Sequence, residues 1–383
     1  MKFIDGLKSR MPLPARFALR LPALPASVAT MVAAVALLLV SIGYVVVIGG
    51  HADIRGPWFG MAMPRTAPHP QALITPRQPA SPAGQPGPAT SSESTSSDGA
   101  AEMPGAQGKP PSFAALPELP LAEPLPDAPQ AGLFRSTPKG NLPTVAADGR
   151  TAATAYARPF TGEPGRPRLA VVVAGLGLDP EATRAAISRL PPEVTLAFSP
   201  YAANLDGWIK EARAAGHEVL LGLPLEPMLF PAHDNGPLSL GAGMSVPAAL
   251  DRLESILGAA SGYVGLLGSF RAPLANSETM TAVLGTVKDS GLLYVGDTVP
   301  ARRPTDLPIA MVTTVADDEP FRSAVDARLS EAATVARRQG AAVAVIHPLP
   351  VSFERASLWI ERLRNDGIEA APVSAVALGG RRG

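Results

Sequence analysis

The sequence predicts a parallel α/β domain in its C-terminal half, with a compact or incomplete barrel as the favoured architecture. Leu169–Val173 is an apolar run without polar alternation, ended by Gly175 and Gly177, as in a strand buried on both faces. The strand, loop and helix pattern then repeats to about Ala371. About eight strands and about six helices fit this span, which is typical of parallel α/β folds. An open doubly wound sheet remains the alternative, because a sequence does not give the strand order.

Each expected element follows from a periodic apolar run and its flanking residues. Pro180 in a first helical turn after Asp179 is a typical helix start. Glycines stand just beyond several expected helix ends, at Gly216, Gly291, Gly340 and Gly367. The expected strands are Leu169–Val173, Val194–Phe198, Glu218–Leu221, Tyr263–Leu267, Leu292–Val295, Ile309–Thr314, Ala342–Ile346 and Ile368–Ala371. The expected helices are Pro180–Leu190, Leu205–Ala215, Val246–Ala259, Ser277–Ser290, Ser323–Gln339 and Phe353–Asp366.

The N-terminus has the pattern of a membrane anchor. Residues 1–25 are basic, and residues 26–49 (Ala26–Gly49) are apolar and uncharged. A span of about 20 apolar residues crosses a bilayer as a helix, and the preceding positive charge places the N-terminus in the cytoplasm. We therefore expect a single-pass protein of a bacterial inner membrane with a periplasmic C-terminal domain. The segment Ile48–Ala52 leaves signal-peptide cleavage open as an alternative.

Residues 50–165 are rich in Pro, Ala, Ser and Gly, and they predict a disordered linker. The tract Gln78–Gly99 has too few apolar residues to offset the entropy of ordering the chain. Leu116–Pro129 favours an extended polyproline conformation, either as a spacer or as a ligand for a partner domain. The globular domain is accordingly expected at residues 166–378.

Overall composition excludes several classes of function. Lys plus Arg equals Asp plus Glu at 33 each, so nothing indicates a nucleic-acid partner. The chain has no cysteine, which excludes disulfides, thiolate nucleophiles and cysteine-ligated metal sites.

Two loops invite enzymatic interpretations that the flanking residues do not favour. Gly175-Leu176-Gly177 lacks the third glycine of a dinucleotide fingerprint, because Pro180 stands in its place. A tight turn is the simpler interpretation. Ser269 follows a predicted strand, but its surroundings differ from a nucleophile elbow, even with His347 as a candidate base.

The remaining candidates follow the carboxyl ends of predicted strands, where parallel α/β folds place their chemistry. His347 ends a strong apolar run, and Glu226, His233 and Asp234 follow the third strand. Asp179 and Asp297 also fall in such loops. These side chains could hold a divalent cation such as zinc, or they could be solvated loop residues, which is the simpler interpretation.

Three blocks carry a resemblance to a known family. VTLAFSPYAANLDGWIKEARAAGHEVLLGLPLEP (Val194–Pro227), YVGLLGSF (Tyr263–Phe270) and VAVIHPLP (Val343–Pro350) resemble the divergent polysaccharide deacetylases of bacterial envelopes. The resemblance covers roughly Pro167–Val376. It implies a NodB-like deformed (β/α) barrel of about seven to eight parallel strands.

The resemblance also implies a catalytic pattern, most of which this chain has lost. The family's Asp pair after the first strand corresponds here to Ala174-Gly175, and the histidine of its third-strand block corresponds to Gly222. The histidine before Gly268-Ser269 is missing, whereas Glu226 and His347 are retained. Asp297 lies near the position where the family has an Asp after its fifth strand.

Metal-dependent deacetylation needs a metal with about three protein ligands and an open position. We therefore expect no metal cofactor and a catalytically inactive domain that binds an envelope glycan or a periplasmic partner protein. Glu226 and His347 are expected to act in the cleft, lined also by Asp179, Ser269, Asp297, His233 and Asp234. The alternatives are an active deacetylase with a rebuilt zinc site and a purely structural interaction module.

Overall fold

The computed structural model describes residues 110–379. The predicted basic segment, the membrane span Ala26–Gly49 and the first part of the linker lie outside the described residues. Within 110–379, no helix is both long enough and apolar enough to cross a bilayer.

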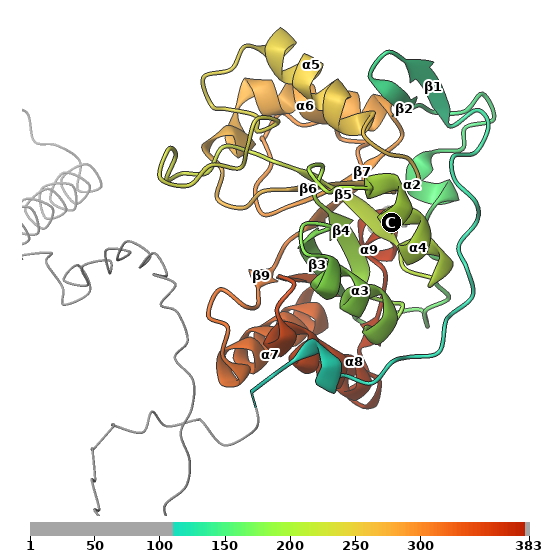
Figure 1. Ribbon diagram of the computed structural model, residues 1–383, viewed down its shortest axis with the longest axis vertical. Coiled ribbons are helices and arrows are strands. Elements are labelled where there is room, and N and C mark those ends of the chain that lie inside the picture. The colour runs from blue at the N-terminus through green and yellow to red at the C-terminus, as the bar shows by residue number, and fades with distance from the viewer. Residues whose placement is uncertain (1–109, 380–383) are drawn as a thin grey trace, which may run out of the picture. The chain divides into compact units, whose positions relative to one another are not determined.

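The centre of the domain is a nine-stranded parallel sheet (Figure 1). Its strand order is β8-β7-β6-β5-β4-β3-β10-β9, and β11 pairs with the start of β3. The strands are β3 (Arg168–Leu176), β4 (Thr195–Phe198), β5 (Val219–Leu223), β6 (Gly265–Gly268), β7 (Leu293–Gly296), β8 (Ile309–Met311), β9 (Thr314–Val315), β10 (Ala341–Ile346) and β11 (Glu369–Ala370). All eight expected strands are present. Most of them are buried apolar runs whose backbone groups hydrogen-bond to neighbouring strands.

The two edges of the sheet are joined by consecutive residues, so the sheet curls into a deformed barrel. β8 pairs with β7, and β9, which follows it directly, pairs with β10. Between them, Val312 N donates to Gly296 O of β7 (2.9 Å) and Thr313 N donates to Val343 O of β10 (2.8 Å). One extended segment therefore bridges both edges. The expected barrel is confirmed, and the open doubly wound alternative is wrong.

Helices between the strands cover the outside of the sheet, as expected. Asp179 caps the first of them, accepting hydrogen bonds from Glu181 N (2.8 Å) and Ala182 N (3.3 Å). Gly340 ends the longest with a φ of 84°, which glycine adopts without strain. The helices are α3 (Pro180–Arg189), α4 (Leu205–Ala214), α5 (Val246–Leu257), α6 (Glu278–Asp289), α7 (Arg322–Gln339) and α8 (Pro350–Asn365), with a 3₁₀ turn η3 (Pro273–Asn276) before α6.

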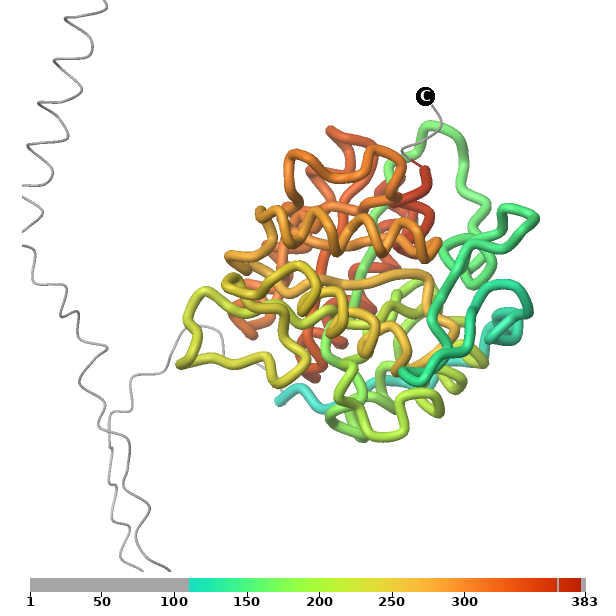
Figure 2. Tube along the Cα trace, turned by 90° about the horizontal axis from the view of Figure 1, so that it is seen from above, coloured from blue at the N-terminus to red at the C-terminus, as the bar shows by residue number. Residues whose placement is uncertain are grey.

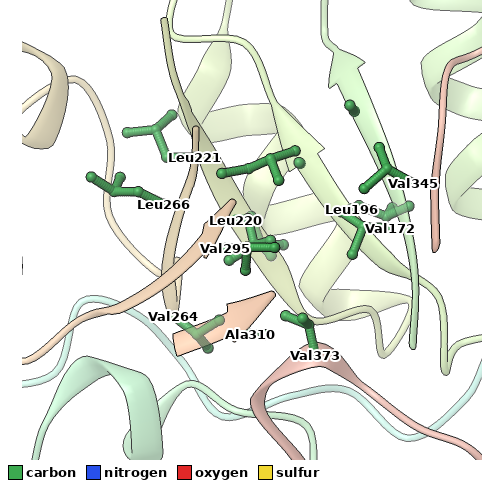
Figure 3. Close-up of a cluster of buried hydrophobic side chains, with 14 of the residues drawn as sticks. Val172, Leu196, Leu220, Leu221, Val264, Leu266, Val295, Ala310, Val345 and Val373 are labelled. Atoms are coloured by element: carbon green, nitrogen blue, oxygen red, sulfur yellow. The ribbon is translucent and has the colours of Figure 1, made fainter. Parts of the chain in front are cut away.

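A short final helix, α9 (Val373–Gly379), lies at the amino ends of the strands and was not anticipated. Figure 3 shows Val373 within the cluster of buried side chains that the strands contribute. Val373 N donates to Thr195 Oγ1 (3.1 Å), and Ser374 N donates to Glu218 Oε1 (2.9 Å). Burial raises the pKa of the Glu218 carboxyl, although the hydrogen bonds that Ser374 donates to it oppose this shift. These hydrogen bonds attach α9 to the end of the barrel where the strands begin.

Residues 110–165, which we call the strap, are part of the fold rather than a disordered linker. They contain the 3₁₀ turn η2 (Phe113–Ala115), the hairpin β1 (Phe134–Thr137) and β2 (Gly140–Pro143), and the short helix α2 (Ala152–Ala155). Figures 1 and 2 show the strap, coloured teal to green, along the outside of the domain.

The strap crosses the outer helices in their sequence order. Leu119 N donates to Ser188 O of α3 (2.9 Å), and Leu125 N donates to Arg213 O of α4 (2.9 Å). Lys139 forms an ion pair with Asp251 of α5, and Ala153 N donates to Gly291 O just beyond α6 (3.0 Å). The strap thus fixes four helices to one another.

Burial explains why this Pro-rich segment is ordered. Leu133, Leu142 and Tyr156 of the strap are at most 4% exposed and belong to the main core cluster. The guanidinium of Arg213, itself 4% exposed, donates to the carbonyls of Pro126 (2.6 Å), Tyr156 (3.0 Å) and Gly262 (2.9 Å). The expected domain boundary at residue 166 is therefore wrong, because residues 110–165 belong to the fold.

Candidate functional site

A cleft of about 770 Å³ opens at the carboxyl ends of the strands. The loops that follow β3, β4, β5, β6, β9 and β10 all contribute to its lining. In a parallel barrel these loops meet at one end, which is where such folds carry their sites. Most lining residues are apolar or glycine, among them Leu178, Phe198, Leu223 and Phe270.

The positions where the resemblance implies catalytic and metal-binding residues converge on this cleft. Ala174, Gly175, Gly222 and His347 all line it. The register explains part of this convergence, since Val172 pairs with Val345, and Ala174 and His347 each follow two residues later on the same face. Three of these four positions carry no polar side chain.

His347 is held by a buried aspartate that sequence analysis did not identify. His347 Nδ1 lies 2.8 Å from Asp317 Oδ1, and its backbone N–H donates to Asp317 Oδ2 (2.6 Å). Ser352 Oγ, in the first turn of α8, donates to the same Oδ2 (2.6 Å). The Asp317 side chain is fully buried, whereas that of His347 is 44% exposed. Asp317 therefore fixes the imidazole at the cleft wall.

The same contacts shift the pKa values of His347 and Asp317. The hydrogen bond that His347 donates to Asp317 raises the pKa of His347, against the opposing effect of burial. Burial alone would raise the pKa of Asp317, but the hydrogen bonds from His347 and Ser352 together hold it below its usual value. Asp317 is thus ionised, and the cation is favoured at His347.

A catalytic metal does not fit the side chains present. Within residues 110–379, no three His, Asp or Glu side chains come together in an arrangement that could hold a metal ion. Ala174, Gly175 and Gly222 offer no donor side chain where the resemblance places Asp and His ligands. No hydrolytic step can be derived through a metal in this cleft.

Ser269 lines the cleft but supports its neighbouring loop. Its Oγ accepts hydrogen bonds from Leu225 N (3.1 Å) and Asn235 Nδ2 (3.3 Å). Both donors belong to the segment between β5 and α5, which also places His233 and Asp234 in the lining. Ser269 therefore anchors that segment, and nothing activates it as a nucleophile.

Three other predicted residues do not belong to the lining. Glu226 lies where its backbone pairs with Leu240, and its carboxylate is packed beside Gly241. Asp179 is occupied as the cap of α3. Asp297 accepts a hydrogen bond from the backbone of Arg271 (2.8 Å), which does line the cleft. The structure thus brings His347, Ser269, His233 and Asp234 together, and leaves these three outside.

The glycine loop after β3 is the tight turn that its sequence suggests. Gly175 and Gly177 have φ values of 78° and 90°. A Cβ atom on Gly177 would lie 2.4 Å from Ala202 Cβ. Gly177 is therefore required for close packing between neighbouring loops.

Sequence reasoning missed Arg271, which lines the cleft, and Asp317, which is buried behind His347. The signal for Asp317 was present, because Ala316-Asp317-Asp318 is separated by only one residue from the expected strand Ile309–Thr314. Arg271 gave no comparable signal, since its place depends on the left-handed turn after β6.

Comparison with known proteins agrees with this geometry. The family model for divergent polysaccharide deacetylases matches residues 171–377, which span β3 to α9 and every strand of the barrel. The chain belongs to the divergent polysaccharide deacetylase family. The family resemblance that the three sequence blocks predict is thereby confirmed.

Several known proteins are similar to this divergent polysaccharide deacetylase. An uncharacterized protein of Agrobacterium tumefaciens C58 is 33% identical, with a TM-score of 0.58, over 62% of this chain and 99% of its own. An uncharacterized protein of Haemophilus influenzae is 25% identical over 209 residues, 52% of this chain and 73% of its own. A putative polysaccharide deacetylase from Mycobacterium smegmatis is 17% identical with a TM-score of 0.32, covering 59% of this chain and 94% of its own.

Proposed function

We propose that this protein is a non-hydrolytic member of its family, which binds an envelope glycan in the cleft at the carboxyl ends of the strands. The observation that carries the proposal is the chemistry of the lining. The positions of the implied metal ligands hold Ala174, Gly175 and Gly222, yet the cleft remains open at about 770 Å³. A site that had lost every use would not need to keep this space or a positioned His347.

His347 is the proposed polar contact for the glycan. Its Nδ1 is occupied by Asp317, so Nε2 is the ring nitrogen left to a ligand at the cleft wall. A hydrogen bond to a sugar hydroxyl contributes on the order of 1 kcal/mol net, and more when the donor is charged. Tyr201, which also lines the cleft and is 36% exposed, offers a ring face for the apolar face of a sugar.

We further propose that the protein acts at the periplasmic face of the inner membrane, anchored through Ala26–Gly49. The basic N-terminus and the uncharged apolar span support this proposal. The test is a C-terminal alkaline phosphatase fusion, which is active only in the periplasm. An inactive fusion, with the intact chain soluble in the cytoplasm, would refute the topology.

The binding proposal is tested with isolated peptidoglycan sacculi and the full-length chain. We expect the wild type to co-sediment with sacculi, and His347→Ala to bind several-fold more weakly at equal folded fraction. Glu226→Ala is the matched control. Glu226 lies at the end of the sequence block Val194–Pro227, but it does not line the cleft. Equal loss in both variants, or no binding by the wild type, would contradict the proposed site.

An active deacetylase with a rebuilt metal site is the competing function. Its candidate ligands His233, Asp234 and His347 line the same cleft, but in the described structure they do not come together in an arrangement that could hold a metal ion. One tightly bound zinc equivalent that is lost in a His233→Ala, Asp234→Ala double variant would establish this competitor.

A further inference from the structure

Arg271 occupies a strained position at the cleft. It follows β6 and has a φ of 53°, in the left-handed region that non-glycine residues rarely adopt. Its backbone N–H donates to Asp297 Oδ2 (2.8 Å), and this bond holds the turn. A strained backbone that fixes one side chain at a site is a common feature of functional residues.

The guanidinium of Arg271 is only weakly engaged. Its Nη2 lies 3.2 Å from Asp318 Oδ2, and the two side chains are 79% and 46% exposed. Exposed ion pairs of this kind contribute little, because water screens them and ordering two side chains costs entropy. A ligand carboxylate can therefore share or replace Asp318, and the planar guanidinium suits a bidentate contact with it.

Both acidic residues in the cleft lining, Asp234 and Asp318, already have a hydrogen-bond or ion-pair partner. Asp234 Oδ1 accepts a hydrogen bond from Gly236 N (2.9 Å), and Asp318 is paired with Arg271. The cationic groups in the lining are the Arg271 guanidinium and the imidazole of His347. The buried Asp317 favours the cationic form of this imidazole. Because most of the surrounding lining is apolar, Arg271 and His347 are cationic donors placed to hydrogen-bond an anionic ligand oxygen.

We propose that the cleft selects glycans that carry a carboxylate, with Arg271 binding the carboxylate and His347 donating from Nε2 to a neighbouring ligand oxygen. This inference rests on the proposed glycan-binding function and names the class of glycan. It assigns Arg271 as the specificity-determining residue, a role distinct from the contacts that any neutral sugar could make.

The test compares two probes that differ only in charge. Oligogalacturonides and their carboxyl-reduced, neutral counterparts of the same length are titrated into the full-length chain. We expect the wild type to bind the acidic probe about tenfold more tightly, as for loss of one charge-assisted hydrogen-bonded pair. Arg271→Gln is expected to remove this preference, so that the two probes bind with similar affinity.

A second variant predicts a change in the opposite direction. Asp318→Asn frees Arg271 from its partner and removes a negative charge, so the affinity for the acidic probe should rise. Arg328→Gln is the matched control, because Arg328 forms a similarly exposed pair with Glu331 on α7, and it should change neither titration.

The outcomes separate this inference from the proposed function. If wild type binds both probes equally and also binds sacculi, the carboxylate selection is wrong and glycan binding stands. If neither probe nor sacculi bind, both proposals fail. A preference for the acidic probe that persists in Arg271→Gln overturns the role of Arg271.

Discussion

His347 and Asp317 meet through both the backbone and the side chain of the histidine. Asp317 Oδ2 accepts from His347 N, and Asp317 Oδ1 lies 2.8 Å from the Nδ1 atom of the same residue. The pair forms because Val315 is opposite Val345 in the register of β9 and β10. Asp317 and His347 each lie two positions beyond this pair of residues, so the two are placed against one another.

The first prediction concerns the protonation of His347. Asp317→Asn should lower the pKa of His347 toward its ordinary value of 6.5, because the charged hydrogen-bond partner is lost. The measurement is an NMR titration of the imidazole protons, with His347→Gln used to assign the signal. Asp318→Asn should lower the pKa less, since Asp318 acts only through its charge. An unchanged pKa in Asp317→Asn would refute the coupling.

The second prediction concerns stability and pH. The raised pKa of His347 contributes stability that is present below about 6.5 and is lost as the pH rises through the folded-state pKa. The lowered pKa of Asp317 contributes stability that is present above 3.8 and is lost as the pH falls through its folded value. His347→Gln should therefore be most destabilising between about pH 4 and 6.5.

Thermal unfolding of the wild type and His347→Gln at pH 5 and pH 8 tests this. The difference in Tm between the two proteins should be larger at pH 5. A difference of the same size at both values would show that His347 contributes only by packing.

A third prediction concerns the strap. Arg213→Ala leaves the carbonyls of Pro126, Tyr156 and Gly262 without their shared donor, which should cost about 3 kcal/mol of unfolding free energy. Arg328→Ala, on the exposed face of α7, should cost less than about 0.5 kcal/mol. Urea denaturation measures both. A chain starting at residue 166 should unfold more readily still, and its full stability would contradict the structural role of the strap.

A fourth prediction separates backbone strain from steric conflict at glycines. Gly149 and Gly177 have similar φ values of 84° and 90°. A Cβ atom on Gly149 would have no neighbour within 4 Å, whereas one on Gly177 would lie 2.4 Å from Ala202 Cβ. Gly149→Ala should cost about 1 kcal/mol from the left-handed conformation alone. Gly177→Ala should cost clearly more, and equal losses of unfolding free energy would contradict the packing argument.

The barrel could be predicted from sequence because its strands are local patterns. Each expected strand is an apolar run that appears where it was placed, and Ile309–Thr314 differs only in dividing into β8 and β9. That division depends on which neighbours each half meets, since the first half pairs with β7 and the second with β10. Pairing of this kind is a tertiary property that one sequence does not reveal.

The strap could not be predicted, because its composition is typical of disorder. Its order depends on Arg213, a residue more than fifty positions further along the chain, which donates to Tyr156 O. The candidate site could likewise be predicted only in part from the sequence. His347 was identified as the residue that ends a strong strand, whereas its partner Asp317 was not singled out although it follows the expected strand Ile309–Thr314. Glu226 was placed in the cleft by its position after the third strand and by the family resemblance, but local pairing with Leu240 turns it away.

The most direct test of the central claim is acetate release from an N-acetylated glycan. The full-length chain is incubated with sacculi or chitooligosaccharides and micromolar zinc or cobalt, and free acetate is measured beside a control without protein. We predict no release above the control, together with sacculus binding that a chelator does not reduce. Metal-dependent acetate release that is abolished by His347→Ala would show that the cleft still performs hydrolysis, and would contradict the account.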